Sequence, residues 1–155
     1  MADLKDRLHT DLTAAMRARD ELTTATLRMA LAAVTEREVA GAVARQLDDE
    51  EVTAVLAQQA KRRREAAEAF DDAGRTELAD RERAELAVLA GYLPQPLDDD
   101  ELRALVAAAV ADAAAAGATG PSAMGVVMRA AQQAAAGRAD GKRLSTEVRA
   151  QLADG

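Results

Sequence analysis

The near-absence of aromatic side chains is the feature that most restricts what this chain can fold into. Hydrophobic residues make up 49% of the 155 positions, yet Phe70 and Tyr92 are the only aromatic residues, and alanine supplies much of the rest. Sandwiches and barrels of β-strands need β-branched and aromatic residues in alternation. Alanine has the highest helix propensity and lets helix backbones approach closely. We therefore predict an all-α protein.

Apolar residues recur every three or four positions through the first 93 residues, which indicates amphipathic helices. Asp20 and Asp48 are suited to cap the second and third of these helices, and Glu51 would complete a capping box with Asp48. Gly41 should end the second helix. Gly74 separates two long helical patterns by a short turn, so we expect an antiparallel hairpin. The predicted helices cover residues 3–18, 21–41, 48–73 and 76–93.

The basic run 61–64 does not form a basic face, because four consecutive residues point in four directions around a helix. Arg63 lies about 20° from Val52 on the helical wheel, within the apolar stripe that should face the next helix. Glu82 occupies the apolar face of that next helix, and Glu85 is the alternative partner. We predict an interhelical ion pair of Arg63 that fixes the register of the hairpin.

Pro94-Gln95-Pro96 marks the best domain boundary, because two prolines form a stiff, extended link between two helical patterns. We expect an elongated N-terminal domain of four helices at residues 1–93, which includes the long hairpin. A linker follows at 94–97, and a compact C-terminal domain of three helices occupies 98–155.

Local signals place the three C-terminal helices. Asp98 and Glu101 should form a second capping box that opens the first helix, which ends at Gly117. Pro121 suits the first turn of the second helix. The third helix follows the glycine-containing loop 137–141.

The formal net charge is −7, so the protein as a whole repels polyanions at long range. Residues 117–155 best suit contact with phosphate, because basic residues outnumber acidic ones there. The loop 137–141 precedes a helix and can present backbone N–H groups to an anion. The alternative is structural, with Gly137 ending one helix and Asp140 capping the next. The candidate nucleic-acid-binding residues are Arg129, Gly137, Arg138, Asp140, Gly141, Lys142, Arg143 and Arg149.

No set of residues suggests catalysis or metal binding. The chain has no cysteine, and its only histidine, His9, lies among charged neighbours on a helix. Ser122 and Ser145 lack a glycine elbow and a nearby histidine. The acidic runs 48–51 and 98–101 stand at helix starts, where carboxylates complement the helix dipole. We therefore expect no catalytic residue, no metal and no cofactor.

The longest all-apolar run, residues 104–111, is far too short to span a bilayer. The N-terminus alternates charged and apolar residues, which is not the pattern of a targeting segment. We expect a cytoplasmic monomer that does not associate with membranes. The excess of arginine over lysine, with abundant alanine, is typical of GC-rich bacterial genomes.

Several short motifs extend over nearly the whole chain. In the N-terminal part they are Leu27-Arg28-Met29 and Gly74-Arg75 with Leu78, Glu82 and Glu85. In the C-terminal part they are Tyr92-Leu93-Pro94-Gln95, Leu97, Glu101-Leu102, Met124-Gly125, Val127-Met128 and Gly137-Arg138-Ala139-Asp140-Gly141, followed by Leu144, Val148 and Leu152. With these motifs the chain resembles the YqeY family, small proteins related to the tail of GatB, the B subunit of tRNA-dependent amidotransferases. We assign structural roles to Pro94, Met124 and Gly125.

The resemblance implies a two-part helical protein whose C-terminal module is similar to one that contacts the tRNA elbow in the larger amidotransferase. It implies no amidotransferase chemistry, because the glutaminase and kinase sites of that enzyme lie in other domains or subunits. The label of carbon–nitrogen ligase activity with glutamine as amido-N-donor would be inherited from the relative.

Two functions remain open from the sequence. The first is an accessory tRNA-binding module that uses the basic C-terminal residues. The alternative is a protein-interaction module that binds a protein of the translation or aminoacyl-tRNA pathway. Its docking face would be Met124, Val127 and Met128, or the exposed side of the long hairpin.

Overall fold

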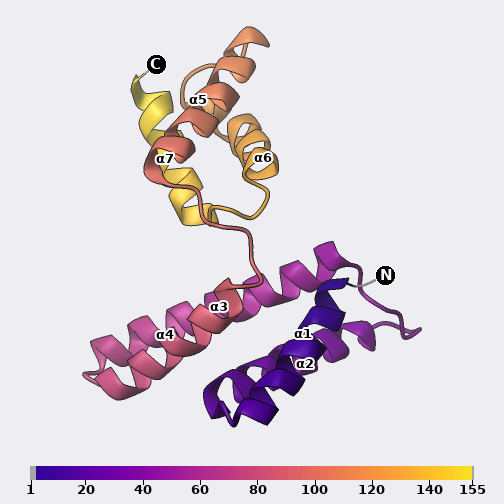
Figure 1. Cartoon of the computed structure of the whole chain (residues 1–155). Helices are drawn as coiled ribbons and strands as arrows, with labels where there is room; N and C mark the ends of the chain where they lie inside the picture. The colour runs from indigo at the N-terminus through magenta and orange to yellow at the C-terminus, as the bar shows by residue number, and fades with distance from the viewer. Residues whose placement is uncertain (1–2, 155) are drawn as a thin grey trace. The chain divides into compact units, whose positions relative to one another are not determined.

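All regular structure in residues 3–154, the part of the chain that this computed structural model describes, is helical (Figure 1). The all-α prediction is therefore confirmed. The chain divides into two units, Met1–Leu93 and Pro94–Gly155, called unit 1 and unit 2 below. Within the described part of the chain, none of the helices combines the length and apolar character needed to cross a bilayer.

Unit 1 consists of four helices: α1 (Asp3–Ala18), α2 (Glu21–Glu38), α3 (Asp49–Asp72) and α4 (Thr76–Ala90). Helices α3 and α4 form the antiparallel hairpin, and Gly74 turns the chain between them with a φ of +72° (Figure 1). Helices α1 and α2 pack against each other and against the hairpin. The core of unit 1 includes Leu8, Leu27, Val34, Leu47, Val52, Leu56 and Leu89, each at most 2% exposed.

Helix α2 ends at Glu38, earlier than the predicted end at Gly41. Glu38 turns inward at this point and is only 9% exposed. Its carboxylate accepts hydrogen bonds from Lys5 Nζ at 2.7 Å and from the backbone N–H of Leu47 at 3.1 Å. These bonds, the one from Lys5 most of all, lower the pKa of Glu38. The same bonds join α1 to the end of α2 and to the segment before α3.

Replacement of Glu38 by glutamine tests this carboxylate. Its folded-state pKa lies below the ordinary value of 4.5. Glu38 therefore stabilises the fold above about pH 4.5 and loses that contribution as the pH falls through the lowered pKa. We expect the free energy of unfolding in urea to fall less between about pH 6 and about pH 3 in Glu38→Gln than in the wild type. An equal fall in both proteins would show that Glu38 is not linked to folding.

Arg63 on α3 joins α2, α3 and α4 in a largely buried polar cluster. Its Nη1 lies 3.7 Å from Glu82 Oε2 and its Nε lies 3.4 Å from Glu85 Oε2, so both of the predicted alternative partners are engaged. Its Nη2 donates to Met29 Sδ on α2 and to Gln59 Oε1 on α3. The side chains of Arg63, Glu82 and Glu85 are 15%, 20% and 14% exposed. One guanidinium therefore serves two carboxylates of the neighbouring helix.

Replacement of Arg63 by methionine removes the cation while keeping much of its volume. Glu82 then keeps no basic partner in the described part of unit 1, whereas Glu85 retains Arg81 at 3.4 Å. Because an unpaired, largely buried carboxylate is costly, we expect urea unfolding to show a loss of about 3 kcal/mol. The double variant Arg63→Met/Glu82→Gln should recover most of it, and the exposed control Arg64→Met should change little. A double variant no more stable than the single one would contradict this account.

Unit 2 is a bundle of α5 (Asp99–Ala115), α6 (Met124–Ala135) and α7 (Gly141–Asp154), which pack pairwise. A 3₁₀ turn, Pro121–Ala123, occupies the predicted start of the second helix, and α6 follows it directly. Leu97, predicted to lie in the linker, is 6% exposed and belongs to the core of unit 2. The core also contains Leu102, Val106, Ala109, Val127, Ala131, Leu144, Val148 and Leu152.

Candidate nucleic-acid interface

The loop between α6 and α7 has the geometry of two adjoining helix caps. Ala136 ends α6 in the left-handed region with a φ of 48°, and Gly137 follows with a φ of +81°. The Asp140 side chain accepts a hydrogen bond of 2.7 Å from the backbone N–H of Arg143, as an N-cap residue does. The loop therefore has the capping arrangement. The backbone N–H of Arg143, which could otherwise bind an anion, donates to the Asp140 carboxylate instead.

Arg138 fixes this loop to the segment that enters unit 2. Its carbonyl accepts from the N–H of Leu97 at 2.8 Å, and its Nε donates to the carbonyl of Gln95 at 2.8 Å. Its Nη2 lies 3.1 Å from Glu101 Oε2. The predicted capping box of Asp98 is therefore only half formed. Asp98 accepts from the N–H of Glu101 at 2.7 Å, but the Glu101 side chain pairs with Arg138.

Arg143 makes a second connection to the same segment. Its Nη1 donates to the carbonyl of Leu97 at 2.9 Å, and its Nη2 lies 3.2 Å from Asp99 Oδ1. The side chains of Arg138 and Arg143 are 41% and 34% exposed. Together they hold residues 95–101 against the loop, and we call this pair the Arg138–Arg143 clamp.

Three of the predicted basic residues, Arg129, Lys142 and Arg149, are exposed and make no ion pair within residues 3–154. Lys142 and Arg149 are seven residues apart on α7, which places them on one face and about 10.5 Å apart along the axis. Arg149 points away from α5, whereas Lys142 borders a shallow hollow that Asp99 and Leu102 of α5 also line. Gln151, about 160° around the helix from Arg149, donates to the carbonyl of Arg103 on α5 at 3.0 Å.

Helix α6 adds an exposed face without carboxylates. Arg129 lies about 160° around the helix from the fully buried Val127, so it points outward. No Asp or Glu occurs between Asp112 and Asp140, a stretch that includes all of α6. We use the term α6–α7 surface for the exposed residues Gly125, Arg129, Gln132 and Gln133 of α6 and Lys142 and Arg149 of α7.

Two glycines beside these cations are not required by the fold. A Cβ added to Gly125 or Gly141 would meet nothing within 4 Å, and neither residue has a positive φ. Gly137 differs, because its φ of +81° favours glycine. A glycine within a helix costs about 0.5–1 kcal/mol relative to alanine. The open backbone at Gly125 and Gly141 therefore has no explanation in packing.

The methionines of α6 face the interior of unit 2. Val127 is fully buried, and Met124 and Met128 are partly buried against the core. Little of the apolar docking face proposed for these three residues is therefore accessible.

The acidic run at the start of α3 acts in capping. Asp48 and Glu51 form the predicted reciprocal capping box. Glu51 also pairs with Arg45 Nη2 at 2.6 Å, and the hydrogen bonds from Arg45 and from the Asp48 backbone lower its pKa to about 2. Among residues 3–154, no group of three or more His, Asp or Glu side chains is arranged to hold a metal ion. His9 is exposed on α1.

The family model described as Yqey-like protein matches residues 5–152 of the chain. The chain belongs to the YqeY family. This membership confirms the resemblance that the sequence motifs indicate. The match runs through the α3–α4 hairpin and through the α6–α7 surface, so both lie in the YqeY-like region. No curated protein matches the chain.

The clamp of this YqeY-family protein could not be read from the sequence. The signal present is an acidic run at 98–101 and a basic loop at 138–143 within one small domain. Their pairing depends on how three short helices close into a bundle, which local patterns do not specify. The glycines without a packing role likewise become recognisable only when their surroundings are known.

Replacement of Arg138 and Arg143 by alanine tests the clamp. The double variant loses hydrogen bonds to the carbonyls of Gln95 and Leu97. We expect a loss of about 1–2 kcal/mol in unfolding free energy and faster hydrogen exchange at the amide of Leu97. The exposed and unpaired Arg149→Ala is the control, with a change within about 0.5 kcal/mol. Unaltered exchange at Leu97 in the double variant would rule out the clamp.

Proposed function

We propose that this YqeY-family protein is an accessory tRNA-binding protein that contacts the tRNA backbone through the α6–α7 surface. The observation that carries the proposal is the exposure of Arg129, Lys142 and Arg149 on two helices, of which α6 contains no carboxylate. These cations make no ion pair within the described residues, although the chain has a net charge of −7. The resemblance of unit 2 to the tail of GatB supports tRNA as the polyanion.

Unpaired cations can bind phosphates without breaking an internal salt bridge. The arginines of the Arg138–Arg143 clamp would first have to leave Glu101 and Asp99, which hold them at 3.1 and 3.2 Å. Lys142 and Arg149 have no such partner, and their separation of about 10.5 Å along α7 lets them reach different phosphates. In this proposal the clamp positions the surface, and the unpaired cations bind.

The open backbone at two glycines supports close approach by a nucleic acid. Gly125 lies one turn before Arg129 on α6, and Gly141 directly precedes Lys142 on α7. The absence of a Cβ allows phosphate or ribose oxygens to reach the main chain. Two of the three cations are thus accompanied by a glycine that the fold does not need.

Three cations on an acidic protein should give weak and salt-sensitive binding. Each phosphate contact contributes about 0.7–0.9 to the slope of log affinity against log salt concentration. Both aromatic residues, Phe70 and Tyr92, lie in unit 1, so unit 2 offers no ring on which bases could stack. Recognition should follow the shape of the tRNA backbone rather than its base sequence.

The proposal includes no catalytic step by this chain. A nucleophilic residue needs an adjacent base. The chain has no cysteine, and its one histidine is the exposed His9 of α1. We therefore propose that any amidotransferase-related role is one of binding.

Titration of labelled bulk tRNA tests the surface. In Arg129→Gln/Lys142→Gln/Arg149→Gln we expect affinity at about 50 mM salt to fall at least about tenfold, because phosphate contacts are lost. The slope of log affinity against log salt should decrease by about 2–3.

The matched control removes the same number of positive charges from unit 1. Arg17→Gln/Arg64→Gln/Arg75→Gln removes three exposed, unpaired cations of unit 1 and should leave affinity within about twofold. No tRNA binding by the wild type, or an equal loss in both triple variants, would contradict the proposed surface.

The glycines provide a second test in which stability and binding change in opposite directions. Gly125→Ala/Gly141→Ala should raise the unfolding free energy by up to about 1 kcal/mol, because alanine favours helix and a Cβ fits at both positions. The same variant should bind tRNA several-fold more weakly. Gly41→Ala, in an exposed loop of unit 1, should leave binding unchanged. A stabilised variant with wild-type affinity would show that tRNA does not approach the backbone there.

A further inference from the structure

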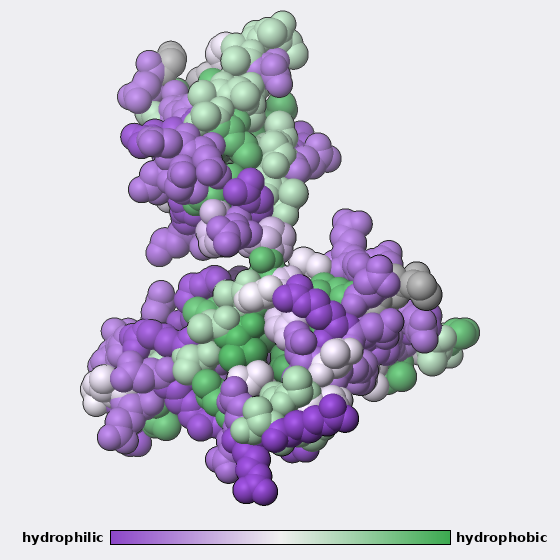
Figure 2. Space-filling view, viewed as in Figure 1, coloured by the Kyte–Doolittle hydropathy of each residue, from purple (hydrophilic) through white to green (hydrophobic). Residues whose placement is uncertain are grey.

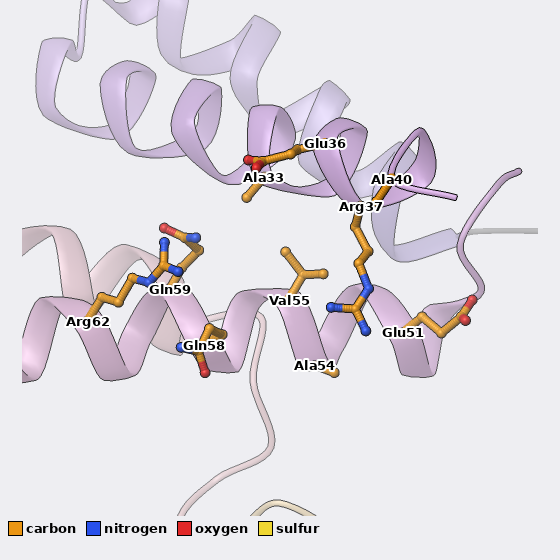
Figure 3. A pocket seen from close by; sticks show the side chains of 10 residues that line it. All are labelled: Ala33, Glu36, Arg37, Ala40, Glu51, Ala54, Val55, Gln58, Gln59 and Arg62. Carbon is orange, nitrogen blue, oxygen red and sulfur yellow. The ribbon is translucent and has the colours of Figure 1, made fainter. Parts of the chain in front are cut away.

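A groove lies between α2 and α3 in unit 1, on elements that the proposed tRNA site does not use (Figure 3). Its volume of about 620 Å³ falls within the range of binding clefts. Ala33 and Val55 lie near its middle together with Glu36 and Gln58, and Arg37 and Arg62 lie toward opposite ends. Ala40, Glu51 and Gln59 also belong to its lining.

The groove has hydrogen-bond donors that lack acceptors. Within residues 3–154, neither Arg37 nor Arg62 makes an ion pair or a side-chain hydrogen bond. Gln59 is only 7% exposed, and its Oε1 accepts from Arg63 at 3.4 Å, but its Nε2 donates to no described residue. Figure 3 shows Gln59 and Arg62 together toward one end and Arg37 toward the other. Such a set of donors fits an occupant that supplies acceptors, carboxylates above all.

Two carboxylates, Glu36 and Glu51, also line the groove, but neither forms a salt bridge with Arg37 or Arg62. Glu51, near Arg37, pairs with Arg45 Nη2 at 2.6 Å and accepts from the backbone N–H of Asp48 at 3.0 Å. Glu36 is exposed and forms no salt bridge with either arginine of the groove. An acidic occupant can therefore bind both arginines without displacing an internal partner.

An exposed apolar loop extends the groove. Residues 39–44 read Val-Ala-Gly-Ala-Val-Ala and contain no polar side chain. Val39 and Val43 are 58% and 78% exposed, and the loop protrudes at the right of Figures 1 and 2 with apolar colouring at its tip. Ala40 belongs to both the loop and the groove lining. A protein partner would bury these valines, whereas a nucleic acid or a small anion would leave them in water.

We propose that this groove docks an amphipathic helix of a partner protein, with the helix's apolar side on Ala33 and Val55 and its carboxylates on Arg37 and Arg62. Arg37 lies between Val55 and Glu51 in Figure 3. Along α3, Arg62 is seven residues from Val55 and eleven from Glu51, so Arg37 and Arg62 are about 10.5–16.5 Å apart along this axis. Two carboxylates seven or eleven residues apart on one face of a partner helix match this range. The proposal concerns unit 1 and does not depend on tRNA binding by unit 2.

A fluorescein-labelled helical peptide tests the docking of full-length protein. The probe is a peptide of about 16 alanine and leucine residues with two glutamates seven positions apart, and its control has lysines at those positions. Fluorescence anisotropy should show at least about tenfold tighter binding of the glutamate peptide. In Arg37→Glu/Arg62→Glu the preference should reverse, because the charges at both ends of the groove are reversed.

Two control variants separate charge from apolar contact. Arg17→Glu/Arg64→Glu makes the same charge change outside the groove and should keep the wild-type preference. Val39→Ser/Val43→Ser should weaken binding of both peptides without altering the preference between them. Circular dichroism establishes that each variant is folded.

Three results would overturn the proposal. They are no peptide binding by the wild type, equal binding of the two peptides, and a glutamate preference that persists in Arg37→Glu/Arg62→Glu. Loss of tRNA binding in that variant would also overturn it, because the groove would then be a nucleic-acid surface. Failure of tRNA to bind the wild type would leave this proposal intact.

Discussion

Pairing between basic side chains and carboxylates of different helices is the interaction on which both units depend. Alanine-rich helices pack closely, but each alanine buries little apolar area and does little to fix one helix against another. In unit 1, Arg63 on α3 pairs with Glu82 and Glu85 on α4 and donates to Met29 on α2. Lys5 links α1 to Glu38 at the end of α2. In unit 2, the Arg138–Arg143 clamp holds the entering segment against the α6–α7 loop. Charged groups thus supply the specificity that large apolar side chains supply elsewhere.

The same pairing determines which cations remain available for partners. In a chain with more acidic than basic residues, a cation remains available to a partner only where no carboxylate pairs with it. Helix α6 achieves this by having no Asp or Glu, and α7 by directing Arg149 away from α5. In the α2–α3 groove, Glu51 is taken by Arg45, which leaves Arg37 available.

The surroundings of these two sets of cations suit different partners. The α6–α7 surface combines cations with glutamine amides and an open glycine backbone, which suits contact with phosphate and ribose. The groove combines cations with an exposed apolar loop, which suits contact with protein. The cations alone would not distinguish a surface for nucleic acid from a surface for protein.

Most of the fold follows from the sequence because helix signals are local. The caps at Asp20 and Asp48 and the turn at Gly74 lie within a few residues of the elements they define. The partners of Arg63 could be predicted for a related reason, because a short hairpin turn fixes which faces of the two helices meet. The end of α2 could not be predicted, because Glu38 there accepts a hydrogen bond from Lys5, thirty-three positions earlier.

The candidate site was only partly predictable for the same reason. The basic residues of α6, α7 and their loop could be named, but their division into clamp and unpaired cations required the position of residues 95–101. The groove also had a sequence signal, because Arg62 lies about 20° from Val55 on the helical wheel of α3. Its existence depends on the spacing between α2 and α3, which no local pattern gives.

An NMR titration of ¹⁵N-labelled full-length protein with tRNA at low salt tests directly whether the α6–α7 surface binds tRNA. We expect amide shifts to concentrate in α6 and α7, with the largest at Gly125, Arg129, Gly141, Lys142 and Arg149, and to disappear as salt is raised. Shifts concentrated in unit 1, or none at saturating tRNA, would contradict the assignment of tRNA binding to the α6–α7 surface.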